Sequence, residues 1–246
     1  MTVQIRRDSD IYAADGGWFQ ARWHFSFDRY RDDAQMGIGP LRVFNDDRLQ
    51  PGAVWPMHPH RDIESCTYVA EGLFAHDDSL GNGGRLRAGA AQVMRFSHAG
   101  ALHSELNGSQ DEPMRFMQFW LIPSDEGLES SVQQREYSAE DRTDILLQIM
   151  GPVGEDGLDL AQDARVMVSR LTAGTSVDRD VSEERGGYFY VMDGAVEIAA
   201  DKLAAGDAAK IFGPERLQIT ATEDAELILI DVPLQFQPVG VWAGRP

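Results

Sequence analysis

The sequence YVAEG at residues 68–72 recurs as YVMDG at residues 190–194, an offset of 122 residues. Further along, LRAGAA at residues 86–91 matches LAAGDA at residues 203–208, an offset of 117. The five-residue difference falls in a glycine-rich stretch between the two matches, where a loop tolerates insertions at little cost. Matches that keep their order and nearly keep their spacing predict two copies of one structural unit.

The segments around these matches are typical of β-strands. Short runs of Val, Ile, Leu and aromatic residues recur between Gly, Pro, Asn and Asp, the pattern of an all-β sandwich or barrel. A hairpin loop is expected at Asp77–Gly84, because its glycines can take positive φ angles. The expected strands include Leu41–Phe44, Ser65–Val69, Met114–Ile122, Tyr188–Met192 and Leu227–Val232.

The polar stretch at residues 123–165 is expected to connect the two units, with one short helix at Ala161–Ala164. The predicted division is an N-terminal lobe over residues 1–132, which binds metal, and a C-terminal lobe over residues 133–246, which does not.

Composition and charge exclude several classes of protein. The net charge of −18 repels the phosphates of nucleic acids and anionic membrane surfaces, so neither is an expected direct partner. No apolar run approaches the ~20 residues of a membrane-spanning helix, and the first residues lack the apolar core of a secretory signal. The single cysteine, Cys66, excludes an intramolecular disulfide and fits a reducing compartment, so a cytoplasmic location is expected.

All six histidines lie in the first 103 residues, and two short motifs contain three of them. His58 and His60 form an H-x-H pair, whereas His103 and Glu105 form an H-x-E pair. Side chains two residues apart on a strand point to the same face, so each pair can aim into a barrel. Three imidazoles and one carboxylate suit Fe, Cu, Ni, Zn or Mn. Such a set leaves one or two coordination positions open for a substrate, as catalysis at a metal requires.

Other residues near these motifs have less specific interpretations. Glu64 lies an even number of residues beyond His60 and is a rival carboxylate ligand to Glu105. His24 is expected to pack or to support a ligand, and His76 is expected to be structural. His98 is either a pocket-rim residue or has no role in the site. Cys66 also lies an even number of residues from His60 and could face the barrel, where a buried apolar role is expected.

The repeat offsets predict that the second lobe binds no metal of this kind. They place no histidine at any position that corresponds to a ligand: Asp180 for His58, Ser182 for His60, Thr220 for His103 and Thr222 for Glu105. The second lobe is therefore expected to be structural or to act as a lid.

Together these motifs resemble the pirin family of the cupin superfamily. The resemblance is dense from about Trp23 to Pro123 and weak beyond it. It rests on WHFSF at 23–27, LRVFNDD at 41–47, HPHRDIE at 58–64, YVAEG at 68–72, HDDSLGNG at 76–83 and HSE at 103–105. The sequence departs from the family in the run MRFSHAGAL at 94–102, which is one residue longer than usual and changes the pocket rim.

The resemblance implies an all-β bicupin, two tandem cupin β-barrels with metal in the N-terminal barrel only. It implies His58, His60, His103 and Glu105 as ligands of a divalent transition metal. Fe(II) is expected, with Cu, Ni, Mn, Co and Zn as alternatives. Bacterial members of the family are associated with quercetin 2,3-dioxygenase activity, and a nuclear member in animals is a transcriptional co-regulator.

The sequence therefore leads to two alternative hypotheses about function. The first is a metal-dependent dioxygenase that cleaves a flavonol with dioxygen, in which Glu105 is both a metal ligand and the catalytic base. Phe25, Phe27, Met94 and Phe96 are candidates for the apolar wall of its pocket. The alternative is a non-enzymatic metal-dependent redox or ligand sensor, or a co-regulator, that acts through a protein partner.

Overall fold

The computed structural model describes residues 2–213 and 215–244, which form strands and three short 3-10 turns. The turns are η1 (Asp8–Asp10), η2 (Glu140–Arg142) and η3 (Gly240–Trp242). The described residues contain no helix that could span a membrane. They divide into two compact units, which we call the first barrel (residues 12–137, 160–162 and 237–244) and the second barrel (the remaining described residues).

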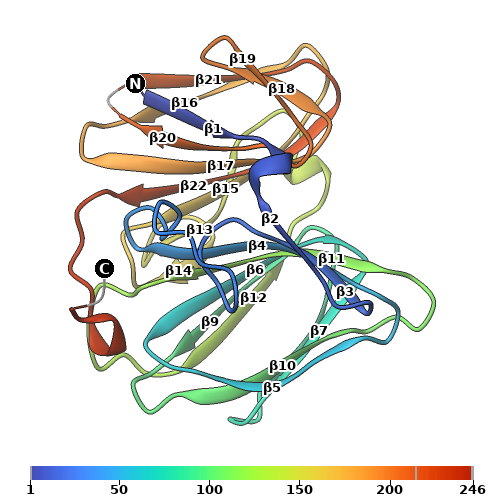
Figure 1. The fold of residues 1–246 in the computed structure, drawn as a ribbon, viewed down its shortest axis with the longest axis vertical. Coiled ribbons are helices and arrows are strands. Elements are labelled where there is room, and N and C mark those ends of the chain that lie inside the picture. Colours follow the sequence, from blue (N-terminus) through green and yellow to red (C-terminus); the bar gives the residue numbers. More distant parts are fainter. Residues whose placement is uncertain (1, 214, 245–246) are drawn as a thin grey trace. The chain divides into compact units, whose positions relative to one another are not determined.

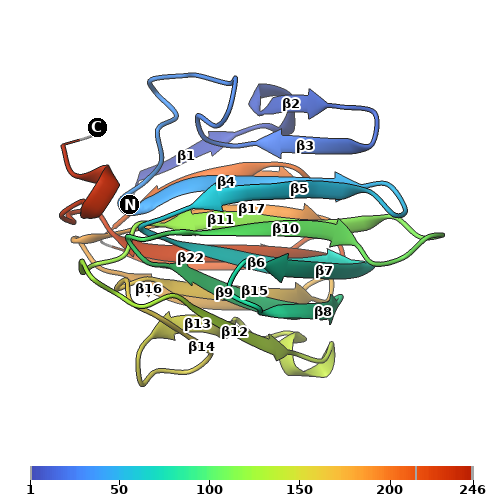
Figure 2. The same cartoon turned by 90° about the horizontal axis from the view of Figure 1, so that it is seen from below.

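Two sheets make up the first barrel, and they face each other in Figure 1. The larger sheet has the strand order β12-β9-β6-β11-β4-β3-β2, and the smaller has the order β5-β10-β7-β8, whose strands lie side by side in Figure 2. The strands are β2 (Tyr12–Asp15), β3 (Phe19–Trp23), β4 (Leu41–Leu49), β5 (Val54–His60), β6 (Ile63–Glu71), β7 (Leu73–Asp78), β8 (Gly83–Arg87), β9 (Ala90–Phe96), β10 (Ala101–Asn107), β11 (Met114–Leu121) and β12 (Ser131–Glu136).

The second barrel repeats this arrangement. Its larger sheet has the order β1-β20-β17-β22-β15-β13-β14, and its smaller sheet has the order β16-β21-β18-β19. The strands are β1 (Thr2–Arg6), β13 (Leu147–Pro152), β14 (Leu158–Leu160), β15 (Arg165–Leu171), β16 (Ser176–Val181), β17 (Arg185–Asp193), β18 (Ala195–Ile198), β19 (Asp201–Ala204), β20 (Ala208–Phe212), β21 (Glu215–Ala221) and β22 (Ala225–Pro233).

The repeated motif also has the same backbone conformation in both barrels. Gly72 follows β6 with φ +79°, and Gly194 follows β17 with φ +75°. A Cβ atom at Gly72 would lie 2.5 Å from the carbonyl oxygen of Pro113, and one at Gly194 would lie 1.9 Å from that of Asp224. Only glycine tolerates both the positive φ and the close approach, so the repeated YV-x-x-G motif encodes the same turn twice.

The division of the chain into the two units differs from the expected boundary between residues 132 and 133, because both ends of the chain belong to the unit formed by the other half. Strand β1 pairs with β20 and belongs to the second barrel, where it takes the edge position that β12 holds beside β9 in the first barrel. Residues 237–244 belong to the first barrel, where Trp242 Nε1 donates to the carbonyl oxygen of Asp62 at 2.9 Å. Strand pairing between segments far apart in sequence therefore completes each unit.

The expected strands are present, within β4, β6, β11, β17 and β22, and the expected hairpin joins β7 to β8. The predicted helix at Ala161–Ala164 is wrong, because this segment forms bends. The backbone N–H groups of Ala161 and Gln162 donate instead to the Glu64 carboxylate, at 2.9 and 3.2 Å. This side chain thus takes the place of the hydrogen bonds that a helix would make.

Candidate metal centre

A β-bulge in the pairing of β5 with β10 arranges the candidate ligands. His58 lies opposite His103, and Trp55 lies opposite Glu105. One residue separates the two partners on β10, whereas two residues separate them on β5. A bulge of this kind turns a side chain out of strict alternation and is common next to functional sites. It lets both Trp55 and His58 line one cavity, although they stand an odd number of residues apart.

Three of the four predicted ligands converge on one point. One ring nitrogen from each of His58, His60 and His103 lies within 4.8 Å of the others. The Nε2 atoms of His58 and His103 are 3.0 Å apart. Two ligands of one ion at bond lengths of roughly 2.1 Å are separated by a distance of this order. Among the residues that the structure describes, this is the one group of three or more metal-binding side chains that converges in this way.

Two of the three imidazoles are held in the neutral form that a metal needs. Burial, with a smaller effect of the neighbouring imidazoles, lowers the pKa of His60 to about 2 and that of His103 to about 3. His58 Nδ1 lies 2.8 Å from the carbonyl oxygen of Pro56. Because a carbonyl only accepts, Nδ1 carries the proton and leaves the Nε2 lone pair of His58 for a metal.

Glu105, the fourth predicted ligand, lies at the edge of this cluster. Its Oε1 atom is 4.0 Å from His103 Nε2 and accepts a hydrogen bond from Gln118 Nε2 on β11. Burial raises the pKa of the Glu105 carboxyl, whereas the electrostatic interaction with His58 and the Gln118 hydrogen bond lower it. The side chain is buried, so Gln118 fixes the carboxylate and leaves Oε2 without that contact.

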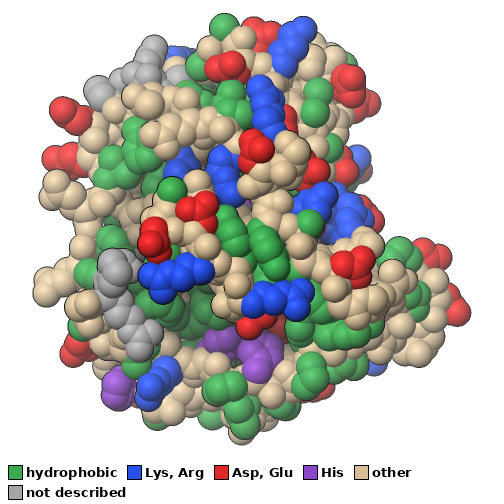
Figure 3. All heavy atoms as spheres, viewed as in Figure 1, with side chains coloured by type: hydrophobic (Ala, Val, Ile, Leu, Met, Phe, Trp, Pro, Cys, Tyr) green, Lys and Arg blue, Asp and Glu red, His purple; other side chains and the backbone are tan. Residues whose placement is uncertain are grey.

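A cavity of about 530 Å³ opens onto these groups. The polar residues that line it are Asp28, Arg29, Asn45, Asp47, His58, His60, Glu105 and Gln118, and its apolar wall consists of Phe19, Trp23, Phe27, Trp55, Pro56, Met57 and Trp120. The volume is typical of small-molecule sites, which span roughly 300–1,000 Å³. Figure 3 shows histidine side chains at the surface of the molecule, with hydrophobic side chains beside them.

Asp47 gives this cavity a buried carboxyl group in addition to that of Glu105. It lies on β4, is 4% exposed, and faces the cavity in which Glu105 also lies. Burial raises the pKa of the Asp47 carboxyl well above its usual range, and the negative charges of Glu105 and Asp46 raise it further.

The residues present fit a divalent transition metal. His60 Nε2 is buried and has no hydrogen-bond partner. The Nε2 atoms of His58 and His103 face each other, so all three histidines place a ring nitrogen in the same small region. A buried polar atom is normally paired, so an open ring nitrogen beside two others fits the position of a metal ligand. Neutral imidazoles with one nearby carboxylate are the donors that first-row transition metals prefer.

The rival ligand Glu64 has a different role. It is fully buried, and Oε1 accepts hydrogen bonds from Arg95 Nη2 at 2.9 Å and from Ala161 N at 2.9 Å. Arg61 and Asp62 form a turn between β5 and β6, so the face of a side chain on β6 does not follow from counting residues from His60. The expectation that parity could place Glu64 beside His60 fails for this reason.

The remaining residues singled out from the sequence lie around the centre or away from it. Cys66 is fully buried on the face of β6 that also carries Glu64, and burial raises the pKa of its thiol. His24 is buried and packs edge-on against Phe44, with ring centroids 4.8 Å apart. His76 is buried and in contact with Gln134, and His98 Nδ1 lies 2.9 Å from Asp62 Oδ2 at an exposed position.

The cavity wall was only partly predictable. Of the four predicted wall residues, Phe27 lines the cavity, and Phe96 lies with its ring 5.2 Å from those of His60 and His103. Met94 packs against Ile63 and Phe96, and Phe25 is fully buried. Sequence reasoning missed Trp55 and Trp120. Trp55 shares a strand with His58, but the bulge hides this relation from strand periodicity.

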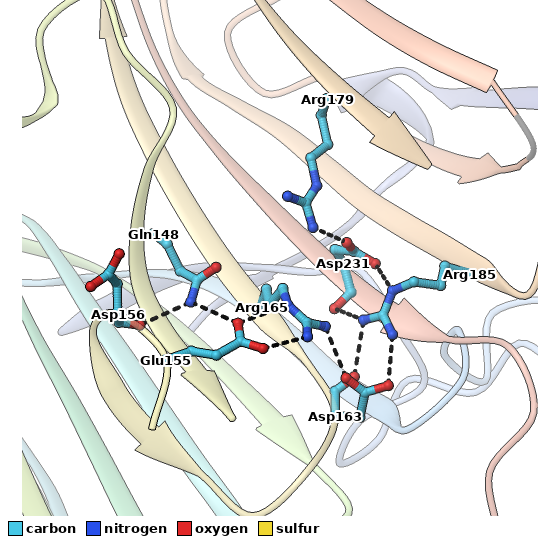
Figure 4. A network of polar contacts seen from close by, with 8 residues as sticks. All are labelled: Gln148, Glu155, Asp156, Asp163, Arg165, Arg179, Arg185 and Asp231. Atoms are coloured by element: carbon cyan, nitrogen blue, oxygen red, sulfur yellow. Dashed lines mark hydrogen bonds and ion pairs between the residues drawn. The ribbon is translucent and has the colours of Figure 1, made fainter. Parts of the chain in front are cut away.

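The corresponding strands of the second barrel carry no such centre in the described residues. Asp180, Ser182 and Thr222 are exposed, and Thr220 lies opposite Ser176 rather than opposite Asp180. Aliphatic side chains from β16 and β21 fill the interior instead: Val177, Val181, Leu217 and Ile219. Arg179, on the same face of β16, reaches Asp231 at 2.6 Å in an ion-pair network with Arg185 and Asp163 (Figure 4).

Comparison with known proteins identifies two domains in this chain. The Pirin family profile matches residues 5–121, and a profile described as the quercetinase C-terminal cupin domain matches residues 148–232. A pirin-like protein of Caulobacter vibrioides is 39% identical over 220 residues, which cover 89% of this chain and 94% of that protein. A quercetin 2,3-dioxygenase of Escherichia coli strain K12 is 33% identical over 233 residues, which cover 94% and 99% of the two chains.

Solved structures show the same architecture. The crystal structure of YhhW from Escherichia coli superposes with a TM-score of 0.90 at 30% identity, covering 96% of this chain and all of that one. The structure of the bacterial pirin YhhW in complex with nickel(II) superposes with a TM-score of 0.87 at 31% identity, covering 97% of this chain and all of that one. A nickel complex of a homologue, together with the three converging histidines, indicates a divalent metal in this fold. The chain, with one Pirin domain and one C-terminal cupin domain, therefore belongs to the pirin family.

Proposed function

We propose that this protein is a metal-dependent dioxygenase that cleaves flavonol-like substrates of the quercetin type. The observation that carries the proposal is the convergence of His58, His60 and His103, of which His58 and His60 line a cavity of about 530 Å³ walled by aromatic rings. Relatives named quercetin 2,3-dioxygenase support the choice of substrate and reaction. Flat aromatic ligands are complementary to a cavity of this size and lining.

His58, His60, His103 and Glu105 would hold one divalent metal, and Fe(II) is the proposed ion. When bound there, it would supply Lewis acidity, which lowers the pKa of a hydroxyl group, and redox activity toward dioxygen. Pro56 supports this set by keeping the proton on His58 Nδ1. Such support from a neighbouring group fixes the tautomer and the ring orientation of a ligand.

Glu105 is the proposed base. Gln118 Nε2 holds its Oε1 atom, so Oε2 is the atom that accepts the proton of the substrate hydroxyl. The raised pKa of the buried carboxyl makes it a stronger base than an exposed glutamate, as proton abstraction near neutral pH requires. Trp55 and Trp120 would hold the flat substrate beside this atom and exclude water.

Oxygen uptake with quercetin tests the proposal. The purified protein is loaded anaerobically with Fe(II), and separate samples are loaded with Mn, Co, Ni, Cu or Zn, before metal content and oxygen consumption are measured. About one metal per chain is expected, with oxygen consumption that is lost in His58→Ala. Metal binding without oxygen consumption for every ion would overturn the dioxygenase proposal and favour a sensor. Failure to bind any metal would overturn the ligand set.

A further inference from the structure

Strand β4 presents an unpaired carboxyl group to the cavity. Asn45 and Asp47 stand two residues apart on β4, share one face of it and both line the cavity. Asp46 points to the other face, where Arg115 Nη2 binds it at 2.8 Å. The carboxyl group of Asp47 forms no hydrogen bond or ion pair with any residue that the structure describes, although Asp47 is only 4% exposed.

The surroundings of Asp47 do not compensate for this burial. Its cross-strand neighbours are Ala21 on β3 and Phe116 on β11, neither of which has a polar side-chain atom. The charged groups that act on it are Glu105 and Asp46, which carry charge of the same sign. Asn45, 2% exposed, likewise has a buried Oδ1 atom without a hydrogen-bond partner.

A polar group of this kind is costly to the fold. Buried polar atoms are almost always paired, and exceptions concentrate at functional sites, where stability is lost in favour of binding. Asp47 faces the same cavity as His58, His60 and Glu105 and comes from the opposite sheet. A ligand that fills the cavity between the sheets would supply the missing partner.

We propose that Asp47, with Asn45 beside it, forms a polar subsite on the larger sheet that binds a hydroxyl group of the substrate other than the one at the metal ligands. A carboxyl oxygen accepts a hydrogen bond, so the complementary ligand group is a hydroxyl donor. The subsite selects polyhydroxylated aromatic substrates over those with a single hydroxyl. The inference rests on the proposed function for the orientation of the substrate.

Binding and stability together test this subsite. Zinc-loaded protein is titrated under anaerobic conditions with quercetin, which is hydroxylated on both ring systems, and with 3-hydroxyflavone, which has only the 3-hydroxyl. Quenching of tryptophan fluorescence reports binding, because Trp23, Trp55 and Trp120 line the cavity. The variants are Asp47→Leu, Asp47→Asn and, as a control, Asp111→Leu at an exposed position.

Asp47→Leu is expected to weaken quercetin binding roughly tenfold or more and to change 3-hydroxyflavone binding much less, because a lost hydrogen bond affects only the hydroxylated ligand. Asp47→Asn keeps an acceptor and is expected to retain part of the preference. The melting temperature of Asp47→Leu should rise, because the variant no longer buries an unpaired carboxyl. Asp111→Leu should change neither quantity.

A purely structural Asp47 would give the opposite results. A lower melting temperature in Asp47→Leu, or an equal loss of affinity for both flavonols, would overturn the subsite. If the wild type binds neither flavonol, the proposed substrate class fails, and pyrogallol against phenol then decides the subsite with the same variants. Loss of a preference for pyrogallol in Asp47→Leu would support it, whereas no preference in the wild type would overturn it.

Discussion

The Nε2 atoms of His58 and His103 face each other at 3.0 Å across the pairing of β5 with β10. The proton of His58 lies on Nδ1, where Pro56 accepts it, so His58 Nε2 presents a lone pair to His103 Nε2. This lone pair can accept a hydrogen bond from His103 Nε2 in the metal-free chain, and a positive ion between the rings would bind both nitrogens instead. The pair is therefore the clearest geometric sign of a metal site in this chain.

Replacement of His103 should remove the metal. His103→Ala is expected to lower bound metal roughly tenfold or more, because a first-row transition metal loses one of its few nitrogen ligands. The matched control is His98→Ala, since His98 is exposed and contacts Asp62 rather than the cluster. Elemental analysis after anaerobic loading measures the metal content. Equal losses in the two variants would contradict the assignment of the ligands.

Glu105→Gln should separate metal binding from turnover. The amide keeps the size of the side chain and one oxygen, so some metal is expected to remain. It cannot accept the substrate proton, and turnover is expected to fall roughly 100-fold or more. Oxygen uptake at a fixed metal content measures the effect. If the loaded variant keeps full activity, Glu105 is not the base.

Glu64 should make stability depend on pH in the direction opposite to most carboxylates. Burial raises its pKa in the folded protein, although Arg95 and the N–H groups of Ala161 and Gln162 lower it in part. The folded protein thus binds the Glu64 proton more tightly than the unfolded chain does. Its contribution to stability is fully present below the ordinary glutamate pKa and is lost as pH rises through the raised, folded-state pKa.

The free energy of unfolding of the wild type relative to Glu64→Gln should therefore fall as pH rises through this interval. Urea unfolding at several pH values measures this difference. Glu129→Gln, at an exposed position, is the control and should show a constant difference from the wild type. If the free energy of unfolding of the wild type relative to Glu64→Gln instead rises with pH, the ion pair with Arg95 outweighs burial.

Asp231 should stabilise the second barrel through its ion pairs. The carboxylate is buried, with Arg179 and Arg185 each at 2.6 Å (Figure 4). Asp231→Asn is expected to cost about 2–3 kcal/mol in unfolding free energy, because it leaves two partly buried guanidinium groups without their shared partner. Asp178→Asn, which breaks the exposed pair with Arg216, should leave the melting temperature unchanged. Similar effects in the two variants would contradict this view of the network.

The all-β class and the duplication were predictable because they depend on local signals. Turn glycines such as Gly72 and Gly194 have to adopt positive φ wherever the chain makes this turn, so the repeat is visible in the sequence. The division of the chain into units was not predictable in this way. Strand β1 completes the second barrel because it pairs with β20, and pairing between residues about 200 positions apart leaves no local pattern.

The candidate ligands were found from the sequence because each pair lies on one strand. The two-residue period of a strand places His58 with His60, and His103 with Glu105, whatever the rest of the chain does. The same period failed across the turn at Arg61 and Asp62, where it suggested Glu64 as a ligand.

What the sequence determined by itself was the β class, the internal repeat and the two paired motifs, because each depends on neighbours along the chain. Only the tertiary structure decided how far the ligand pairs converge, that Trp55 joins them through a bulge, and that Asp47 stands unpaired in their cavity. These features depend on which strands pair and in what register, and register is set by packing across the whole sheet.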